Sequence, residues 1–215
     1  MEFNIEKELH EAVEKLEERL KIKNGFLVNL LNEDDWSFVI KSHALIEASV
    51  TNCLTHFLGY DKLASIFSRL ELGSKYCGKL EFAKELELLS DNERRFISSL
   101  SQLRNQLVHN VTEVNFDFHN YINNMDFNQK KKFIDNFGYC YLTEKSGGQY
   151  EIINKDLILA EPKKTIWLSL RFVLATISFS ININVSERKA SLLKSQIYEY
   201  QEAIIQSLKS TKILP

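Results

Sequence analysis

Proline first appears at position 162 of this 215-residue chain, and that placement limits the fold more than any other feature. Proline breaks helices because it lacks a backbone N–H and its ring clashes with the preceding turn. The whole chain has only 2 Pro and 7 Gly, so helix breakers of both kinds are scarce. The sequence therefore predicts an all-α body, and its length is sufficient for a core that needs no disulfides or metals.

Charge and cysteine usage exclude several classes of protein. The formal net charge of −2 excludes a polycationic nucleic-acid binder, although it is compatible with a local basic site. Cys53, Cys77 and Cys140 are odd in number and form no CxxC pair, which argues against a disulfide framework and against a zinc site. The acidic, amphipathic N-terminus does not resemble a signal peptide, so we expect a cytoplasmic protein without metal or cofactor.

Apolar residues spaced three and four apart predict a series of helices. Asn24-Gly25 is expected to end the first of them and Gly59 the second, because both sites suit a left-handed C-cap. Ser90 and Glu93 have the spacing of a capping box and mark the start of the best-defined helix. The predicted ranges are 4–22, 34–58, 62–72, 79–89, 90–110, 162–181 and 186–209.

The densest apolar stretch, Ile166 to Ile183, is interrupted by Arg171 and by several Ser and Asn residues. It is shorter than the roughly 20 apolar residues that a membrane helix requires. We therefore interpret it as a buried core helix and expect no membrane partner.

Residues 113–160 break the helical pattern. The first part mixes Asn, Asp and aromatic residues without a clear period, although 130–137 has helical character. Residues 139–153 contain two β-prone runs separated by Ser146-Gly147-Gly148, which predicts a small hairpin. The simplest organisation is a single helical domain over 1–215, with an insertion at about 113–160.

One polar cluster lies at the end of the best-defined helix, where Arg104, Asn105 and His109 form an RNxxxH pattern. Arginine offers a fork of donors to a phosphate, and a histidine exchanges protons near neutral pH, so the pair suits phosphodiester chemistry. Arg104 lies about 140° from His109 around an ideal helix. The arginine side chain must therefore bend, the helix end must distort, or a second copy must complete the site. The phosphate-binding loops, zinc-protease motifs and serine-hydrolase motifs are absent from the sequence.

These three residues match the motif of the HEPN superfamily (higher eukaryotes and prokaryotes nucleotide-binding domains), which the chain resembles over about residues 35–112. The segment from Phe67 to Gly73 is similar to the helix before this motif in the related mannitol operon repressor family. Val111 occupies the position where some HEPN toxins carry a Tyr that is silenced by nucleotidylation, so that regulation is not implied.

The resemblance implies a HEPN-like helical bundle that acts as a homodimer and as a metal-independent endoribonuclease on RNA. Such an enzyme would be the toxin or effector of a prokaryotic toxin–antitoxin or phage-defence system, with an antitoxin as a further partner. His109 would be the general base or acid, Arg104 would hold the scissile phosphate, and Asn105 would orient His109 or the phosphate. The alternative that the resemblance leaves open is a non-catalytic regulator or a nucleotide- or protein-binding module.

His43 and Glu47 lie four residues apart, within the apolar stripe predicted for 34–58. A buried carboxylate needs a partner. We therefore expect Glu47 to pair with His43, Arg104 or a backbone donor and to support the motif. Each residue also has a purely architectural interpretation: an Arg104–Glu47 ion pair between two helices, or His109 facing a helix dipole.

Overall fold

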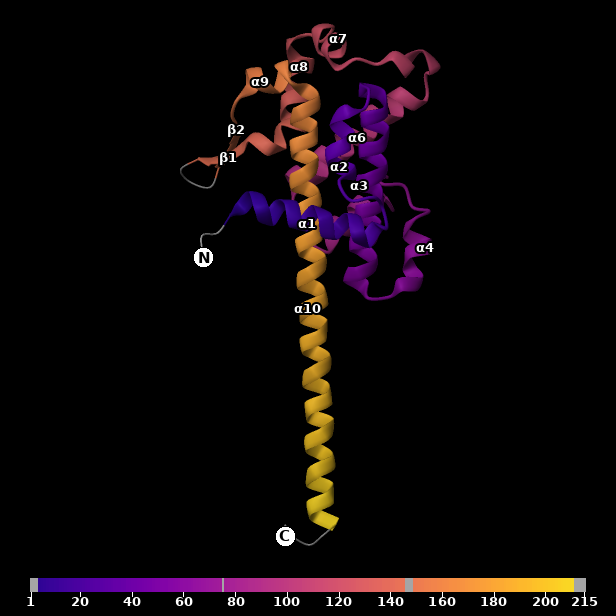
Figure 1. Ribbon diagram of the computed structural model, residues 1–215, viewed down its shortest axis with the longest axis vertical. Helices are drawn as coiled ribbons and strands as arrows, with labels where there is room; N and C mark the ends of the chain where they lie inside the picture. Colours follow the sequence, from indigo (N-terminus) through magenta and orange to yellow (C-terminus); the bar gives the residue numbers. More distant parts are fainter. Residues whose placement is uncertain (1–3, 75, 146–148, 211–215) are drawn as a thin grey trace.

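The computed structural model describes residues 4–74, 76–145 and 149–210 and confirms an all-α fold with one small β-hairpin (Figure 1). The 3₁₀ helices are η1 (Leu30–Asn32), η2 (Asp61–Leu63), η3 (Val111–Asn115) and η4 (Gly138–Tyr141). The strands β1 (Leu142–Lys145) and β2 (Gln149–Ile152) pair antiparallel. The α-helices are α1 (Ile5–Leu20), α2 (Phe26–Asn29), α3 (Asp35–Leu58), α4 (Ala64–Phe67), α5 (Lys79–Glu85), α6 (Asp91–Val108), α7 (Phe118–Asn123), α8 (Phe127–Phe137), α9 (Lys155–Ala160) and α10 (Pro162–Ser210).

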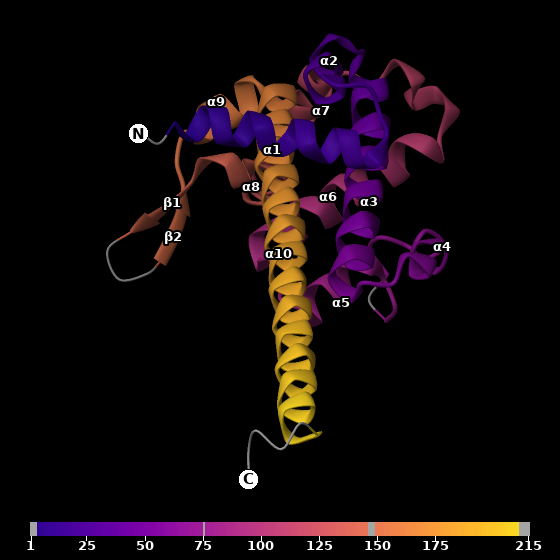
Figure 2. The same cartoon turned by 60° about the horizontal axis from the view of Figure 1, so that its bottom comes forward.

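Helix α10 forms the axis of the protein. Its first half packs against α1 and α3, and its second half extends well beyond the rest of the fold (Figures 1 and 2). Residues Pro162–Glu187 are long and apolar enough to cross a membrane by length and composition. However, one face of this stretch is buried in the core of the protein, through Ile166, Leu170, Leu174, Ile177 and Ile181. Each such side chain contributes about 1.5–3 kcal/mol on burial, which supports the interpretation as a core helix.

The site-bearing helix α6 begins where the sequence predicts. Ser90 and Glu93 form the expected capping box, and Glu93 also accepts a hydrogen bond from the Tyr139 hydroxyl at 3.1 Å. The predicted apolar stripe is buried, through Phe96, Leu100, Leu103 and Leu107. This stripe packs α6 against α3 and α8. The opposite face of α6 is polar, and exposed Gln102 and Asn105 lie on it.

The two helices predicted for 162–181 and 186–209 are in fact one, and the prediction of a break was wrong. A helix that begins at 186 requires the Ser186 side chain to cap its N-terminus. The Ser186 hydroxyl instead donates to the carbonyl of Asn182, one turn earlier, and Asn184 donates to Ser180 in the same way. These side chains bond within the helix rather than at an end, so the backbone continues through them.

The early helices end sooner than predicted. Lys21 takes the left-handed C-cap of α1, so that helix ends before Asn24-Gly25. The helix predicted for 62–72 stops at Phe67, and the hydroxyl of Ser68 bonds back to the carbonyl of Ser65. Helix α5 covers Lys79–Glu85 rather than 79–89. The chain between α4 and α5 turns so that Leu72 accepts a backbone hydrogen bond from Leu80.

The segment 113–160 contains the helices α7, α8 and α9, the 3₁₀ helix η4 and the hairpin. Helix α8 starts at Phe127, earlier than predicted, because Asp126 and Gln129 form a second capping box. Buried Ser169 of α10 accepts from the backbone N–H of Cys140 and donates to the carbonyl of Phe137, which fixes this segment to the core. The predicted hairpin is confirmed by β1 and β2, whereas the turn predicted at Ser146-Gly147-Gly148 lies outside the described residues.

Candidate functional site

Arg104, Asn105 and His109 line a single pocket of about 410 Å³ within one chain. Its other walls come from α3, which contributes His43 and Glu47, and from the segment that precedes α5. Three of the remaining lining residues, Ser98, Ser101 and Gln102, also belong to α6, and the others are Glu71, Leu72 and Gly73. The five residues predicted as catalytic or supporting therefore surround one space.

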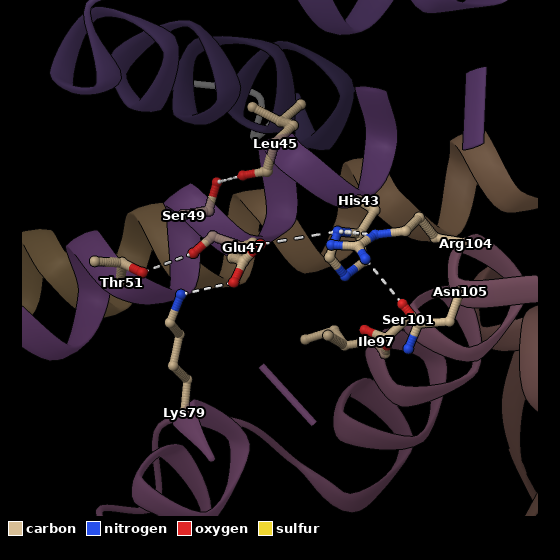
Figure 3. A network of polar contacts seen from close by, with 10 residues as sticks. All are labelled: His43, Leu45, Glu47, Ser49, Thr51, Lys79, Ile97, Ser101, Arg104 and Asn105. Atoms are coloured by element: carbon tan, nitrogen blue, oxygen red, sulfur yellow. Dashed lines mark hydrogen bonds and ion pairs between the residues drawn. The ribbon is translucent and has the colours of Figure 1, made fainter. Parts of the chain in front are cut away.

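The bend of the Arg104 side chain accounts for the angular mismatch between Arg104 and His109. Its Nη1 donates to the side-chain oxygen of Asn105 at 2.9 Å, which draws the guanidinium round to the polar face of α6 (Figure 3). His109 is the C-cap of α6 and is exposed, while Arg104 is half-buried. Both groups thus reach the pocket without a second copy of the chain. Asn105 contacts Arg104 through its side chain, and its carbonyl accepts the backbone N–H of His109.

Arg104 also connects α6 to α3. Its Nε donates to Nδ1 of His43 at 3.4 Å. A guanidinium has five N–H donors. With one bonded to His43 and one to Asn105, three have no acceptor within the described part of the chain. These N–H groups are available to an anion in the pocket, and Arg104 is held in place to receive it.

His43 is buried and neutral. Burial, together with the positive charge of Arg104, lowers the pKa of His43 from 6.5 to about 4. Because Nδ1 accepts the hydrogen bond from Arg104, the single proton of the neutral ring must be on Nε2. The same Nδ1 lies 3.9 Å from Oε2 of Glu47, and without a proton between them this contact is not a hydrogen bond.

The partner of Glu47 is Lys79, which the sequence interpretation did not single out. The Lys79 ammonium lies 2.8 Å from Oε1 of Glu47, and the Lys79 side chain is only 1% exposed (Figure 3). The expected pair between Glu47 and Arg104 is not formed. A sequence signal for Lys79 did exist: it precedes Ala83 by four residues and therefore shares the buried face of α5.

The neutral state of His43 predicts a pH-dependent stability. In the unfolded chain a histidine takes up a proton near pH 6.5, whereas folded His43 does so only near pH 4. Between these values the unfolded state binds more protons, so the free energy of unfolding falls on acidification. The shift corresponds to about 3 kcal/mol, fully present above pH 6.5 and lost by pH 4. Urea unfolding at several pH values checks this for wild type against His43→Gln. If the free energy of unfolding changed with pH in the same way in both proteins, the assignment of this pH dependence to His43 would be wrong.

Within the described residues, no group of three or more His, Cys, Asp or Glu side chains could hold a metal ion. The pocket itself offers two groups that can bind an anion or exchange a proton, the Arg104 guanidinium and the His109 imidazole. No family model, curated protein or solved structure gives a significant match to this chain.

Proposed function

We propose that the protein is a metal-independent endoribonuclease of the HEPN type. The observation that carries the proposal is that Arg104, with three unused N–H groups, and exposed His109 line one pocket. Phosphodiester cleavage requires a cation for the phosphate and a group that moves a proton. These two residues provide both functions without a metal.

The reaction uses the ribose itself as the nucleophile. His109 takes the proton of the 2′-hydroxyl, whose oxygen then attacks the adjacent phosphorus. Arg104 binds the phosphate oxygens and stabilises the charge that develops on them. The bond from phosphorus to the 5′-oxygen breaks, and water supplies the proton to that leaving oxygen. The products are a 2′,3′-cyclic phosphate and a free 5′-hydroxyl, so DNA is not a substrate.

The contacts refine the supporting roles. Asn105 holds the guanidinium of Arg104, and His43 holds its Nε. Both are positioning residues for the phosphate-binding group. Glu47 is paired with Lys79 and does not contact the guanidinium. Following the resemblance, we further propose a cytoplasmic homodimer without a membrane partner, acting as the toxin or effector of a prokaryotic toxin–antitoxin or phage-defence system, with an antitoxin as partner.

RNA cleavage in excess EDTA tests the proposal. The purified protein should cut single-stranded RNA and leave 2′,3′-cyclic phosphate ends, which mass spectrometry identifies. The matched control is the same oligonucleotide with 2′-deoxyribose throughout, which should remain intact because it lacks the nucleophile. Products ending in 3′-hydroxyl groups, or no cleavage of any RNA, would reject this function.

One observation favours the alternative of a non-catalytic HEPN- or mannitol-repressor-like regulator or binding module. Arg104 bonds across two helices, from α6 to His43 of α3, as an architectural residue would. In that case Arg104→Ala should lower the melting temperature, and the wild-type protein should leave RNA intact. A nuclease should instead lose activity in His109→Ala, whose exposed side chain makes no hydrogen bond within the described residues.

A further inference from the structure

A second pocket, of about 300 Å³, lies on the other flank of α6. Its lining follows helical spacing on two facing helices. Helix α6 contributes Ser99, Gln102, Leu103 and Gln106, which are positions i, i+3, i+4 and i+7 of one face. Helix α8 contributes Gln129, Lys132, Phe133, Asn136 and Phe137 with the same spacing. Tyr121 of α7 closes the pocket together with Asn124 and Met125, the two residues that follow this helix.

The lining of this pocket is chemically distinctive. It holds five carboxamide side chains, one lysine and no carboxylate: Gln102, Gln106, Asn124, Gln129, Asn136 and Lys132. Phe133 and Phe137 are buried and give it an aromatic floor. Gln106, Asn124 and Asn136 have no side-chain hydrogen-bond partner among the described residues. An aromatic floor with unpaired amides around it suits a flat, polar ligand that both stacks and forms hydrogen bonds.

The two pockets are adjacent. Gln102 lines both of them, and its side chain donates to Ser98, which belongs to the first. Around α6, Asn105 and His109 lie on one side of Gln102, at about −60° and −20°. Gln106 and Ser99 lie on the other side, at about +40° and +60°. One polar face of α6 therefore faces the Arg104–His109 pocket on one flank and the amide-lined pocket on the other.

We propose that the amide-lined pocket binds a nucleobase of single-stranded RNA next to the scissile phosphate, and that adenine is the base it prefers. This proposal rests on the proposed ribonuclease function for the identity of the ligand. It assigns a role to α7 and α8: this part of the 113–160 segment supplies base specificity, while α6 supplies the chemistry.

The side chains favour adenine over the other bases. A carboxamide pairs with the N6 and N7 atoms of adenine through its oxygen and its NH₂ group. Recognition of cytosine commonly uses a carboxylate that accepts from N4, and the described lining has none. Recognition of guanine commonly uses Arg or Lys, and the lining holds one such residue, Lys132, against five carboxamides. An unstacked base also stacks on aromatic rings, and half-buried Tyr121 can provide one at this pocket.

The test measures binding separately from cleavage, in the His109→Ala background. Fluorescence anisotropy with six-nucleotide homopolymers of A, G, C and U gives the four affinities. We expect A to bind at least about tenfold more tightly than C or U. Asn136→Leu and Gln106→Met, which keep side-chain size but remove the amide, should reduce that preference by about tenfold each. The matched control is Asn128→Leu, because Asn128 is the one carboxamide of α8 outside the pocket.

The outcomes separate this proposal from the nuclease proposal. Equal affinity for all four homopolymers, or an A preference that persists in both pocket variants, overturns the base site whether or not the wild type cuts RNA. A preference that depends on Asn136 and Gln106 supports the base site even if the wild type proves inactive in EDTA. Circular dichroism melts of both variants establish that a lost preference does not come from unfolding.

Discussion

His109→Ala is expected to lower the rate of RNA cleavage by about 10² to 10⁴-fold, the usual contribution of a general acid or base. His109 is exposed at the C-cap of α6, so its truncation should change the free energy of unfolding by no more than about 0.5 kcal/mol. Single-turnover cleavage in EDTA and a urea titration measure the two quantities. A variant that cuts RNA at the wild-type rate would remove His109 from the mechanism.

Arg104→Ala should reduce cleavage by about 10² to 10³-fold, since it removes the cation that binds the phosphate. Arg104→Lys should recover only part of this, because an ammonium cannot reproduce the fork that contacts both His43 and Asn105. Arg95→Ala and His119→Ala are matched controls, because both residues are exposed and neither lines the pocket. Equal losses in the controls would indicate a general effect of charge rather than a site.

Several helix boundaries that rest on local contacts could be predicted from sequence, although the capping box that starts α8 was missed. Asp34 and Gly59 bound α3, and Ser90 with Glu93 starts α6, because each of these contacts spans five residues or fewer. The continuity of α10 could not be predicted in the same way. A serine hydroxyl at position 186 can cap a new helix or bond back to Asn182, and local sequence does not distinguish the two.

In the candidate site, too, contacts between residues near in sequence could be predicted and contacts between distant residues could not. Arg104, Asn105 and His109 lie within six residues, so the sequence places them on neighbouring turns of α6, while the approach of the guanidinium to His109 depends on its contact with Asn105. The contact between Arg104 and His43 spans 61 positions, and that between Lys79 and Glu47 spans 32. Such pairs depend on how α3, α5 and α6 pack. Spacing on α3 identified Glu47 as a carboxylate in need of a partner, but the partner belongs to another helix.

Removal of one partner from the ion pair between buried Lys79 and half-buried Glu47 should have a large effect on stability. Glu47→Ala would leave the Lys79 ammonium, 1% exposed, without a counter-charge, and the cost should be about 3 to 5 kcal/mol. Lys79→Met should cost less, because the Glu47 carboxylate is 30% exposed and can be hydrated, while methionine fills the space of the lysine chain. Combining the two changes removes both charges, so the double variant should be more stable than Glu47→Ala alone.

Urea unfolding of the two single variants and the double variant gives the coupling energy between Lys79 and Glu47. The matched control is Glu85→Ala, which removes an exposed partner of Lys84 and should change stability by less than about 1 kcal/mol. A loss of that size for Glu47→Ala would mean that the Lys79 ammonium is hydrated in the folded protein. If the double variant were no more stable than Glu47→Ala, the loss of stability in Glu47→Ala would come from packing and not from the unpaired charge of Lys79. With the large coupling energy that we expect, the ion pair holds α5 against α3, next to the wall of the Arg104–His109 pocket. Because Lys79 then balances the charge of Glu47, His43 stays neutral and accepts the hydrogen bond from Arg104.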